Sequence, residues 1–165
     1  MTELAERFEV SLSTVHREVR RLIEADLVTE RPVGRSILMR ANTGNRAAAA
    51  LTELLTVTFG PEAVVAEEFD SIPAVRTVLI FGSWAARRTG SPGGPPNDID
   101  VLVLGEPSRA DIYDAADRAR QRLNIQVNPV IRPADRWLEM ADPLIQQIKS
   151  SPFVLAYGEL PDDEG

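Results

Sequence analysis

Apolar positions follow mainly helical spacing in the first third of the chain, and strand patterns alternate with helical ones beyond residue 73. Helical spacing of apolar residues predicts helices at residues 2–8, 12–25 and 46–58, with two short strands at 28–40 joined by a turn at 32–35. Beyond residue 73, short β-branched apolar runs alternate with helical patterns. They predict strands at 75–81, 98–104 and 125–131, helices at 108–124 and 135–150, and a short edge strand at 153–157.

This change of pattern predicts an α/β protein built from two modules. We expect an N-terminal domain at 1–40, a helical connector at 41–72, a mixed-sheet α/β domain at 73–158 and an acidic tail at 159–165. Hydrophobic residues make up 44% and charged residues 26% of the 165 residues, as in soluble globular proteins. Residues 1–40 carry seven basic and seven acidic side chains, so the net charge of −7 belongs to the remainder. We therefore expect the two modules to meet different partners.

The composition also excludes several kinds of site. The chain has no cysteine and a single histidine, His16, which excludes disulfides, thiolate zinc sites and histidine-rich metal cages. No apolar run reaches the roughly 18 residues of a membrane helix, and Glu3, Glu6 and Arg7 make the N-terminus unlike a secretory signal. These features predict a cytoplasmic protein with no membrane partner.

The helix predicted at 12–25 has one apolar and one basic face. Ser11 is a good N-cap, and Val15, Val19 and Leu22 share the apolar side. Polar and basic residues that could reach a DNA groove lie opposite them: Ser13, Thr14, His16, Arg17, Arg20 and Arg21. Arg31 and Arg35 lie in the strand pair that follows. A solvated basic helix face is the alternative interpretation.

The order of helix, turn, helix and strand pair resembles the winged helix-turn-helix of bacterial regulators of the arsenic-repressor and multiple-antibiotic-resistance type. The resemblance implies that residues 1–40 bind a duplex DNA operator, as a homodimer, with the arginines on bases and phosphates. Two features depart from the pattern: Glu9 stands where a glycine is usual, and no helix precedes the motif. We therefore expect the open core to be covered by the helix at 46–58, in one chain or in a dimer, or by a segment upstream of Met1.

The most specific motif joins the strands at 75–81 and 98–104. Gly82 and Ser83 close the first of these strands, and Asp98 and Asp100 alternate along the second, so that both carboxylates share one face. The layout resembles the glycine–serine, spacer, Asp-x-Asp motif of minimal nucleotidyltransferases in the DNA polymerase β superfamily. The resemblance implies an NTP bound at Gly82 and Ser83, Mg²⁺ or Mn²⁺ on the two aspartates, and phosphate contacts from Arg87 or Arg88. Ordinary capping aspartates beside a loop are the alternative.

Catalytic activity is a separate question from the fold. Enzymes of this family supply a third carboxylate from the next strand, and the matching residue here is Asn128, which cannot accept a proton. One hypothesis is therefore a DNA-binding regulator of toxin–antitoxin or conflict-system type that transfers a nucleotidyl group to a protein or RNA hydroxyl. The alternative is a non-catalytic regulator that senses a nucleotide. An antibiotic-modifying transferase is less favoured, because no substrate-binding domain follows residue 158.

Overall fold

The computed structural model describes residues 1–34, 36–139 and 141–161 and divides the chain into two compact units. Met1–Leu54 form the N-terminal unit and Leu55–Gly165 the C-terminal unit. The boundary falls inside one helix, α3 (Ala48–Phe59).

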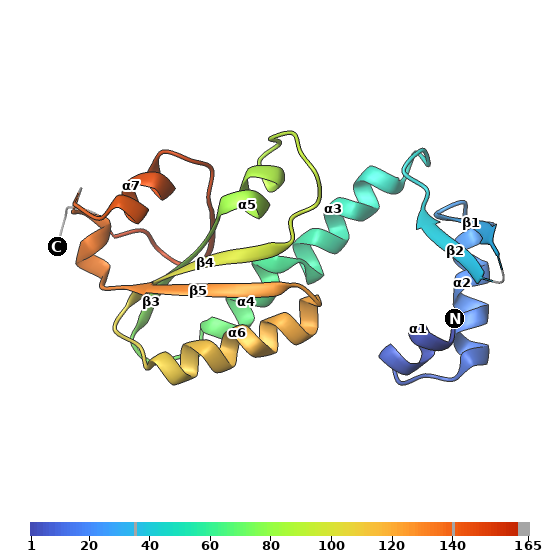
Figure 1. Ribbon diagram of the computed structural model, residues 1–165, viewed down its shortest axis with the longest axis horizontal. Coiled ribbons are helices and arrows are strands. Elements are labelled where there is room, and N and C mark those ends of the chain that lie inside the picture. The colour runs from blue at the N-terminus through green and yellow to red at the C-terminus, as the bar shows by residue number, and fades with distance from the viewer. Residues whose placement is uncertain (35, 140, 162–165) are drawn as a thin grey trace. The chain divides into compact units, whose positions relative to one another are not determined.

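The N-terminal unit contains two helices followed by an antiparallel strand pair: α1 (Thr2–Arg7), α2 (Leu12–Glu24), β1 (Val28–Val33) and β2 (Ser36–Ala41) (Figure 1). The Ser11 side chain caps α2 by accepting a hydrogen bond from the Thr14 backbone N–H at 3.2 Å. Val15 is the buried residue of α2. The helices and strands expected here are therefore present, with their bounds shifted by a few residues.

The described residues of the C-terminal unit form a four-stranded mixed sheet in the order β5-β4-β3-β6. Its strands are β3 (Val75–Phe81), β4 (Asp98–Gly105), β5 (Gln126–Arg132) and β6 (Val154–Gly158). β3 runs antiparallel to β4 and β6, whereas β4 and β5 are parallel. The expected α/β fold class with a mixed sheet is confirmed, and the strand expected at 153–157 is the edge strand β6.

Helices cover both faces of this sheet (Figure 1). On one face, α4 (Pro61–Phe69) and α6 (Arg109–Leu123) pack over Val78, Val101 and other buried strand residues. On the other face lie α5 (Gly82–Arg88), a short 3-10 helix (Ala134–Trp137) and α7 (Pro143–Lys149). Alternate residues of β3 and β4 therefore enter two different apolar clusters.

Two sequence-based expectations are corrected. The helix expected at 135–150 is instead a 3-10 helix and the separate helix α7, because Asp142 caps a new helix that Pro143 begins. The expectation that no stretch is long enough to span a membrane is also wrong. By length and composition alone, Ala48–Phe69 would reach across one. Its second half, however, buries Val64, Val65 and Phe69 in the core of the C-terminal unit.

Candidate functional site

Two carboxylates meet at the start of strand β4. Asp98 and Asp100 alternate with the fully buried Ile99, so both side chains leave the sheet on the same face. β5 lies beside β4 in parallel register, which places Asn128 directly opposite Asp100. The Asn128 side-chain amide donates to Asp98 Oδ2 at 3.1 Å and to Asp100 Oδ1 at 3.4 Å. The structure therefore brings three of the predicted site residues together.

Gly82 completes this cluster from the end of strand β3. Phe81 pairs with Asp100 across the antiparallel β3–β4 ladder, and α5 begins at the next residue. Gly82 has a positive φ of 74°, and a Cβ placed on it would lie 2.5 Å from Asp100 Oδ2. Glycine is therefore needed here for two reasons: the backbone conformation, and the close approach of a carboxylate.

The surroundings of Asp100 favour its protonated form. Burial raises the pKa of the Asp100 carboxyl above its ordinary value, the hydrogen bond from Asn128 opposes the rise, and the charge of Asp98 adds to it. A cation bound between the two carboxylates would relieve the same repulsion. The site is therefore suited to a positively charged ligand.

The oxygen atoms of this cluster are donors that Mg²⁺ accepts. They come from two carboxylates and one carboxamide, and no group of three His, Cys, Asp or Glu side chains gathers within the described residues. The side-chain nitrogen of Asn128 donates to both aspartates. The side-chain oxygen would face a cation between the two carboxylates only after the amide group flipped. The donor set fits Mg²⁺ or Mn²⁺ with one charge fewer than three carboxylates would supply.

The residues predicted to bind phosphate groups lie in α5, and their surroundings differ. Ser83 is exposed in the first turn of the helix. Arg87 instead turns toward the loop that follows: its Nε donates to the Gly94 carbonyl and its Nη1 to the Ser91 carbonyl, both at 3.2 Å. Arg87 therefore holds the Gly/Pro-rich loop 89–97 in place. Arg88 is half-buried.

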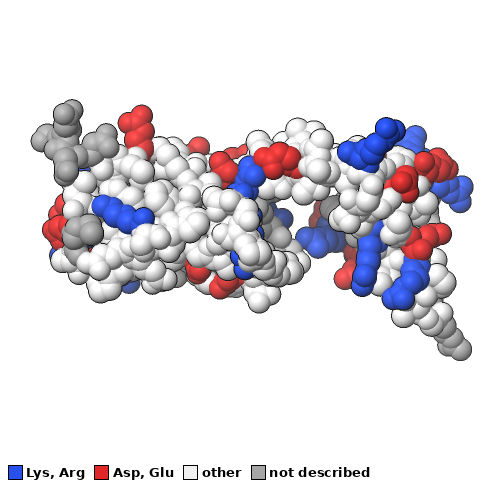
Figure 2. Space-filling view, turned by 90° about the horizontal axis from the view of Figure 1, so that it is seen from above, with Lys and Arg blue, Asp and Glu red and all other residues white. Residues whose placement is uncertain are grey.

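The predicted DNA-binding residues lie on the exposed side of α2 and on the strand pair. His16, Arg17, Arg20 and Arg21 are exposed on the helix, and Arg31 is exposed on β1. On the face drawn in Figure 2, basic side chains are concentrated on the N-terminal unit, at the right of the view. Arg35 lies outside the described residues.

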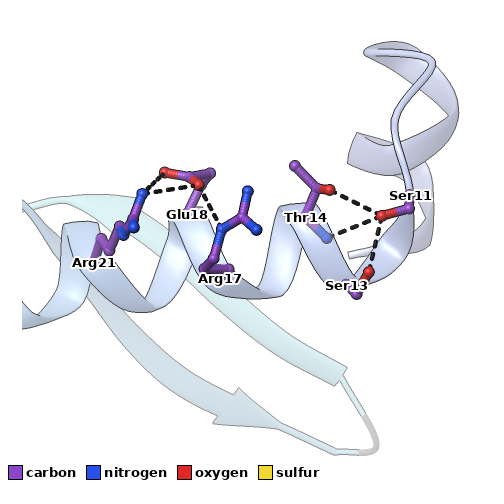
Figure 3. Close-up of polar contacts among 6 residues, drawn as sticks. All are labelled: Ser11, Ser13, Thr14, Arg17, Glu18 and Arg21. Carbon is purple, nitrogen blue, oxygen red and sulfur yellow. Dashed lines mark hydrogen bonds and ion pairs between the residues drawn. The ribbon is translucent and has the colours of Figure 1, made fainter.

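Glu18 is a residue of this surface that the sequence reasoning missed (Figure 3). It accepts hydrogen bonds from Arg17 Nε at 3.0 Å and from Arg21 Nη1 at 3.1 Å. These bonds, first that from Arg17 and then that from Arg21, hold the pKa of Glu18 below its ordinary value. The three-residue spacing of Glu18 and Arg21 is visible in the sequence and could have revealed this pair. The one-residue spacing of Arg17 and Glu18 predicts no contact.

The hydroxyl groups at the start of α2 are also engaged. Ser11 Oγ lies 2.8 Å from Ser13 Oγ and 2.8 Å from Thr14 Oγ1, in addition to capping the helix (Figure 3). Ser13 and Thr14 would therefore have to exchange these bonds in order to contact a base.

Comparison with known proteins gives only distant similarities. No protein-family model and no curated protein matches the chain. Among solved structures, a toxin–antitoxin crystallised with AMP-PNP is 20% identical, with a TM-score of 0.43 over 59% of this chain and 73% of that chain. A structure of tri-AMPylated Shewanella oneidensis HEPN toxin with MNT antitoxin is 21% identical, with a TM-score of 0.41 over 63% and 75% of the two chains. At these identities and TM-scores, the similarity carries no functional argument.

Proposed function

We propose that the C-terminal unit binds a nucleoside triphosphate with Mg²⁺ or Mn²⁺ and transfers a nucleotidyl group to a hydroxyl of a partner protein or an RNA. The observation that carries this proposal is the approach of Asp100 to the side-chain-free backbone at Gly82, with Asp98 on the same face of β4. Carboxylates hold the cation, and a glycine lets phosphate oxygens come close to backbone amides. Ser83, exposed beside Gly82, would donate its hydroxyl to the phosphates.

In the proposed reaction, a bond forms between the acceptor oxygen and the α-phosphorus, the bond from that phosphorus to the bridging oxygen breaks, and pyrophosphate leaves. The cation, when bound, neutralises phosphate charge and polarises the α-phosphoryl group. Asp98 and Asp100 position it. Asn128 cannot take the proton of the acceptor hydroxyl, so the proton passes to one of the two aspartates or to water.

Asn128 also supports a second candidate, a regulator that binds the nucleotide without turning it over. A neutral amide between two aspartates leaves the site with fewer negative charges than a two-metal centre normally has. In that case NTP binding would alter the affinity of the N-terminal unit for DNA. Label transfer distinguishes the two candidates.

The test is incubation of the full chain with each α-labelled NTP, with Mg²⁺ or Mn²⁺, and with the products of neighbouring genes. Transfer of label to a partner, lost in Asp98→Asn and kept in the exposed control Asp135→Asn, supports the transferase. NTP binding without transfer in every combination supports the sensor. If the chain binds no NTP with either metal ion, both proposals are wrong.

The N-terminal unit is proposed to bind a duplex operator through α2 and the strand pair, as the sequence indicates. The support is the exposure of Arg17, Arg20 and Arg31. In a gel shift with the DNA upstream of the protein's own gene, Arg17→Ala should weaken the binding free energy by about 1–3 kcal/mol if this side chain reads a guanine edge. Arg31→Ala should weaken binding to all sequences more evenly. If no duplex is retained at low salt, the unit is a protein-interaction module instead.

A further inference from the structure

The loop 89–97 joins the two parts of the candidate site. It leaves α5, the helix that carries Gly82 and Ser83, and it ends at Asp98, the first residue of β4. Its nine residues include three glycines and three prolines, residues that suit turns and interrupt regular structure. The contacts that fix this loop therefore bear on where the start of β4 is held.

The first half of the loop is fixed by the end of α5. The Gly90 backbone N–H donates to the Arg87 carbonyl at 3.1 Å, and the Ser91 N–H donates to the Ala86 carbonyl at 2.8 Å. The Thr89 hydroxyl also donates to the Ala86 carbonyl, at 3.1 Å. These bonds close the last turn of the helix, and none of them uses the side chain of Arg87.

The Arg87 side chain reaches the second half of the loop. Its Nε donates to the Gly94 carbonyl and its Nη1 to the Ser91 carbonyl, both at 3.2 Å. The guanidinium lies against the backbone of Gly93, because a Cβ placed on this glycine would collide with it. Gly93 also has a positive φ of 151°. A planar group with its N–H donors in a fixed fork is well suited to bridge two carbonyls beside a glycine.

The point held by Arg87 lies close to Asp98 along the chain. Three residues separate Gly94 from Asp98, namely Pro95, Pro96 and Asn97. Each proline ring fixes its own φ, so a Pro-Pro pair is stiff and extended. Holding the Gly94 carbonyl therefore restricts the position of the first residue of β4.

Asp98 is also the aspartate whose backbone is most exposed to local opening. It stands at the end of the β4–β5 register, opposite Gln126, whereas Asp100 lies two residues further into the strand. The ends of a ladder open more easily than its middle. The Asp98 carboxylate nevertheless has to meet the Asn128 amide, which donates to it at 3.1 Å. The segment before Asp98 therefore contributes to placing this carboxylate.

We propose that Arg87 is a positioning residue for Asp98. By holding the second half of the loop, its guanidinium fixes the Asp98 carboxylate where it meets Asn128 and the proposed cation. The part of this inference that concerns the cation rests on the proposed function, whereas the effect on the Asp98–Asn128 contact needs no ligand. The role differs from the phosphate contact that the sequence predicts for Arg87, and the two roles respond differently to substitution.

The test breaks one contact from its two sides. Arg87→Ala removes the guanidinium, and Gly93→Ala places a methyl group where the guanidinium lies. Gly90→Ala is the matched control in the same loop. Gly90 also has a positive φ, 97°, but no described atom lies within 4 Å of a Cβ placed on it. The control therefore adds a similar backbone strain without displacing Arg87.

Two measurements on the ligand-free chain report the expected effect, with folding checked by circular dichroism. We expect the backbone amides of Asn97 and Asp98 to exchange hydrogen about tenfold faster in Arg87→Ala and in Gly93→Ala, because two hydrogen bonds that hold the loop are lost. The NMR signal of the Asn128 side-chain amide should shift in both variants and stay unchanged in Gly90→Ala. The double variant should be no worse than the more severe single variant, since both act on one contact.

Calorimetric titration with Mn²⁺ alone, and with Mn²⁺ and each NTP, distinguishes positioning from phosphate binding. Arg87→Lys keeps the charge but loses the planar fork, so it and Gly93→Ala should both weaken the binding of Mn²⁺ alone several-fold. If Arg87 is a phosphate ligand instead, Gly93→Ala binds the metal–NTP complex like the parent and Arg87→Ala leaves the affinity for Mn²⁺ alone unchanged. That result, or unchanged exchange and an unchanged Asn128 signal in Arg87→Ala, overturns the proposal. If no chain binds Mn²⁺ or NTP, the proposed function is wrong, whereas exchange and NMR still decide the role of Arg87.

Discussion

The Asn128 side chain lies between the two aspartates of strand β4 and donates to Asp98 Oδ2 at 3.1 Å. The parallel β4–β5 register sets this relationship, because it places Asn128 opposite Asp100. A neutral amide here partly offsets the repulsion between two carboxylates that a third carboxylate would increase. At the proposed metal site, a carboxylate in place of Asn128 would add repulsion in the metal-free state and affinity for a cation.

Asn128→Asp should raise nucleotidyl transfer, or reveal it where the parent chain shows none. The substitution replaces a neutral group with a charged ligand at a metal site, where a single catalytic contact is often worth about 10²–10³ in rate. Label transfer from an α-labelled NTP measures the change. Asn128→Ala is the control, since it removes the amide without adding charge and should not be more active than the parent.

The Asn128→Asp variant should have a lower melting temperature than the parent chain without metal and should regain stability with Mg²⁺. A third carboxylate beside Asp98 and Asp100 adds repulsion that a bound cation removes. Melting curves in EDTA and in Mg²⁺ provide the comparison. A folded variant that binds metal and is no more active than the parent would mean that another group takes the proton.

Asp98→Ala and Asp100→Ala together should abolish binding of the metal–NTP complex. Both charged oxygen donors of the site are then lost, and the remaining Asn128 amide is a weak ligand. Calorimetric titration with Mg²⁺ and each NTP measures the loss. Asp117→Ala is a suitable control, because Asp117 is a surface residue paired with Arg120. Binding like that of the parent in the double variant would move the nucleotide site elsewhere.

The stabilisation that ionised Asp142 contributes to the fold should be lost in acid. The hydrogen bond from Arg132 and those from the Leu144 and Ile145 backbone N–H groups hold the pKa of this carboxyl below its ordinary value. A lowered pKa in the folded state means that the stabilisation is present above the ordinary aspartate pKa and is lost as pH falls through the folded-state value. Melting temperatures of the parent and Asp142→Asn should therefore differ near neutral pH and converge in acid. A difference that stays constant across this range would contradict the assignment.

Glu18→Gln should strengthen binding of the N-terminal unit to duplex DNA. The substitution removes the carboxylate that pairs with Arg17 and Arg21 and frees both guanidinium groups for phosphates. For every additional phosphate that an arginine neutralises, the salt dependence of log K should steepen by about 0.9. Glu24→Gln, at the end of the same helix, is the charge-matched control. If both variants bind alike, net charge rather than release of the arginines explains the effect.

Local patterns predicted most of the secondary structure. The run of β-branched residues in 75–81 and the alternation of Asp98 with Asp100 predicted two strands and a shared carboxylate face, because side chains alternate across any strand. The helix 12–25 likewise followed from the capping residue Ser11 and the spacing of Val15. The helix expected at 135–150 is wrong because Asp142 caps a new helix that begins at Pro143.

Short-range spacing along the chain is therefore enough to predict the strands, the α2 helix and the residues available for a metal site. Spacing does not predict that the Asn128 amide donates to both aspartates or that a Cβ at Gly82 would meet Asp100, because both depend on how the strands pair. Side-chain direction likewise turns Arg87 toward its own loop. These features depend on strand register, side-chain direction and the packing of elements, and spacing along the chain does not specify them.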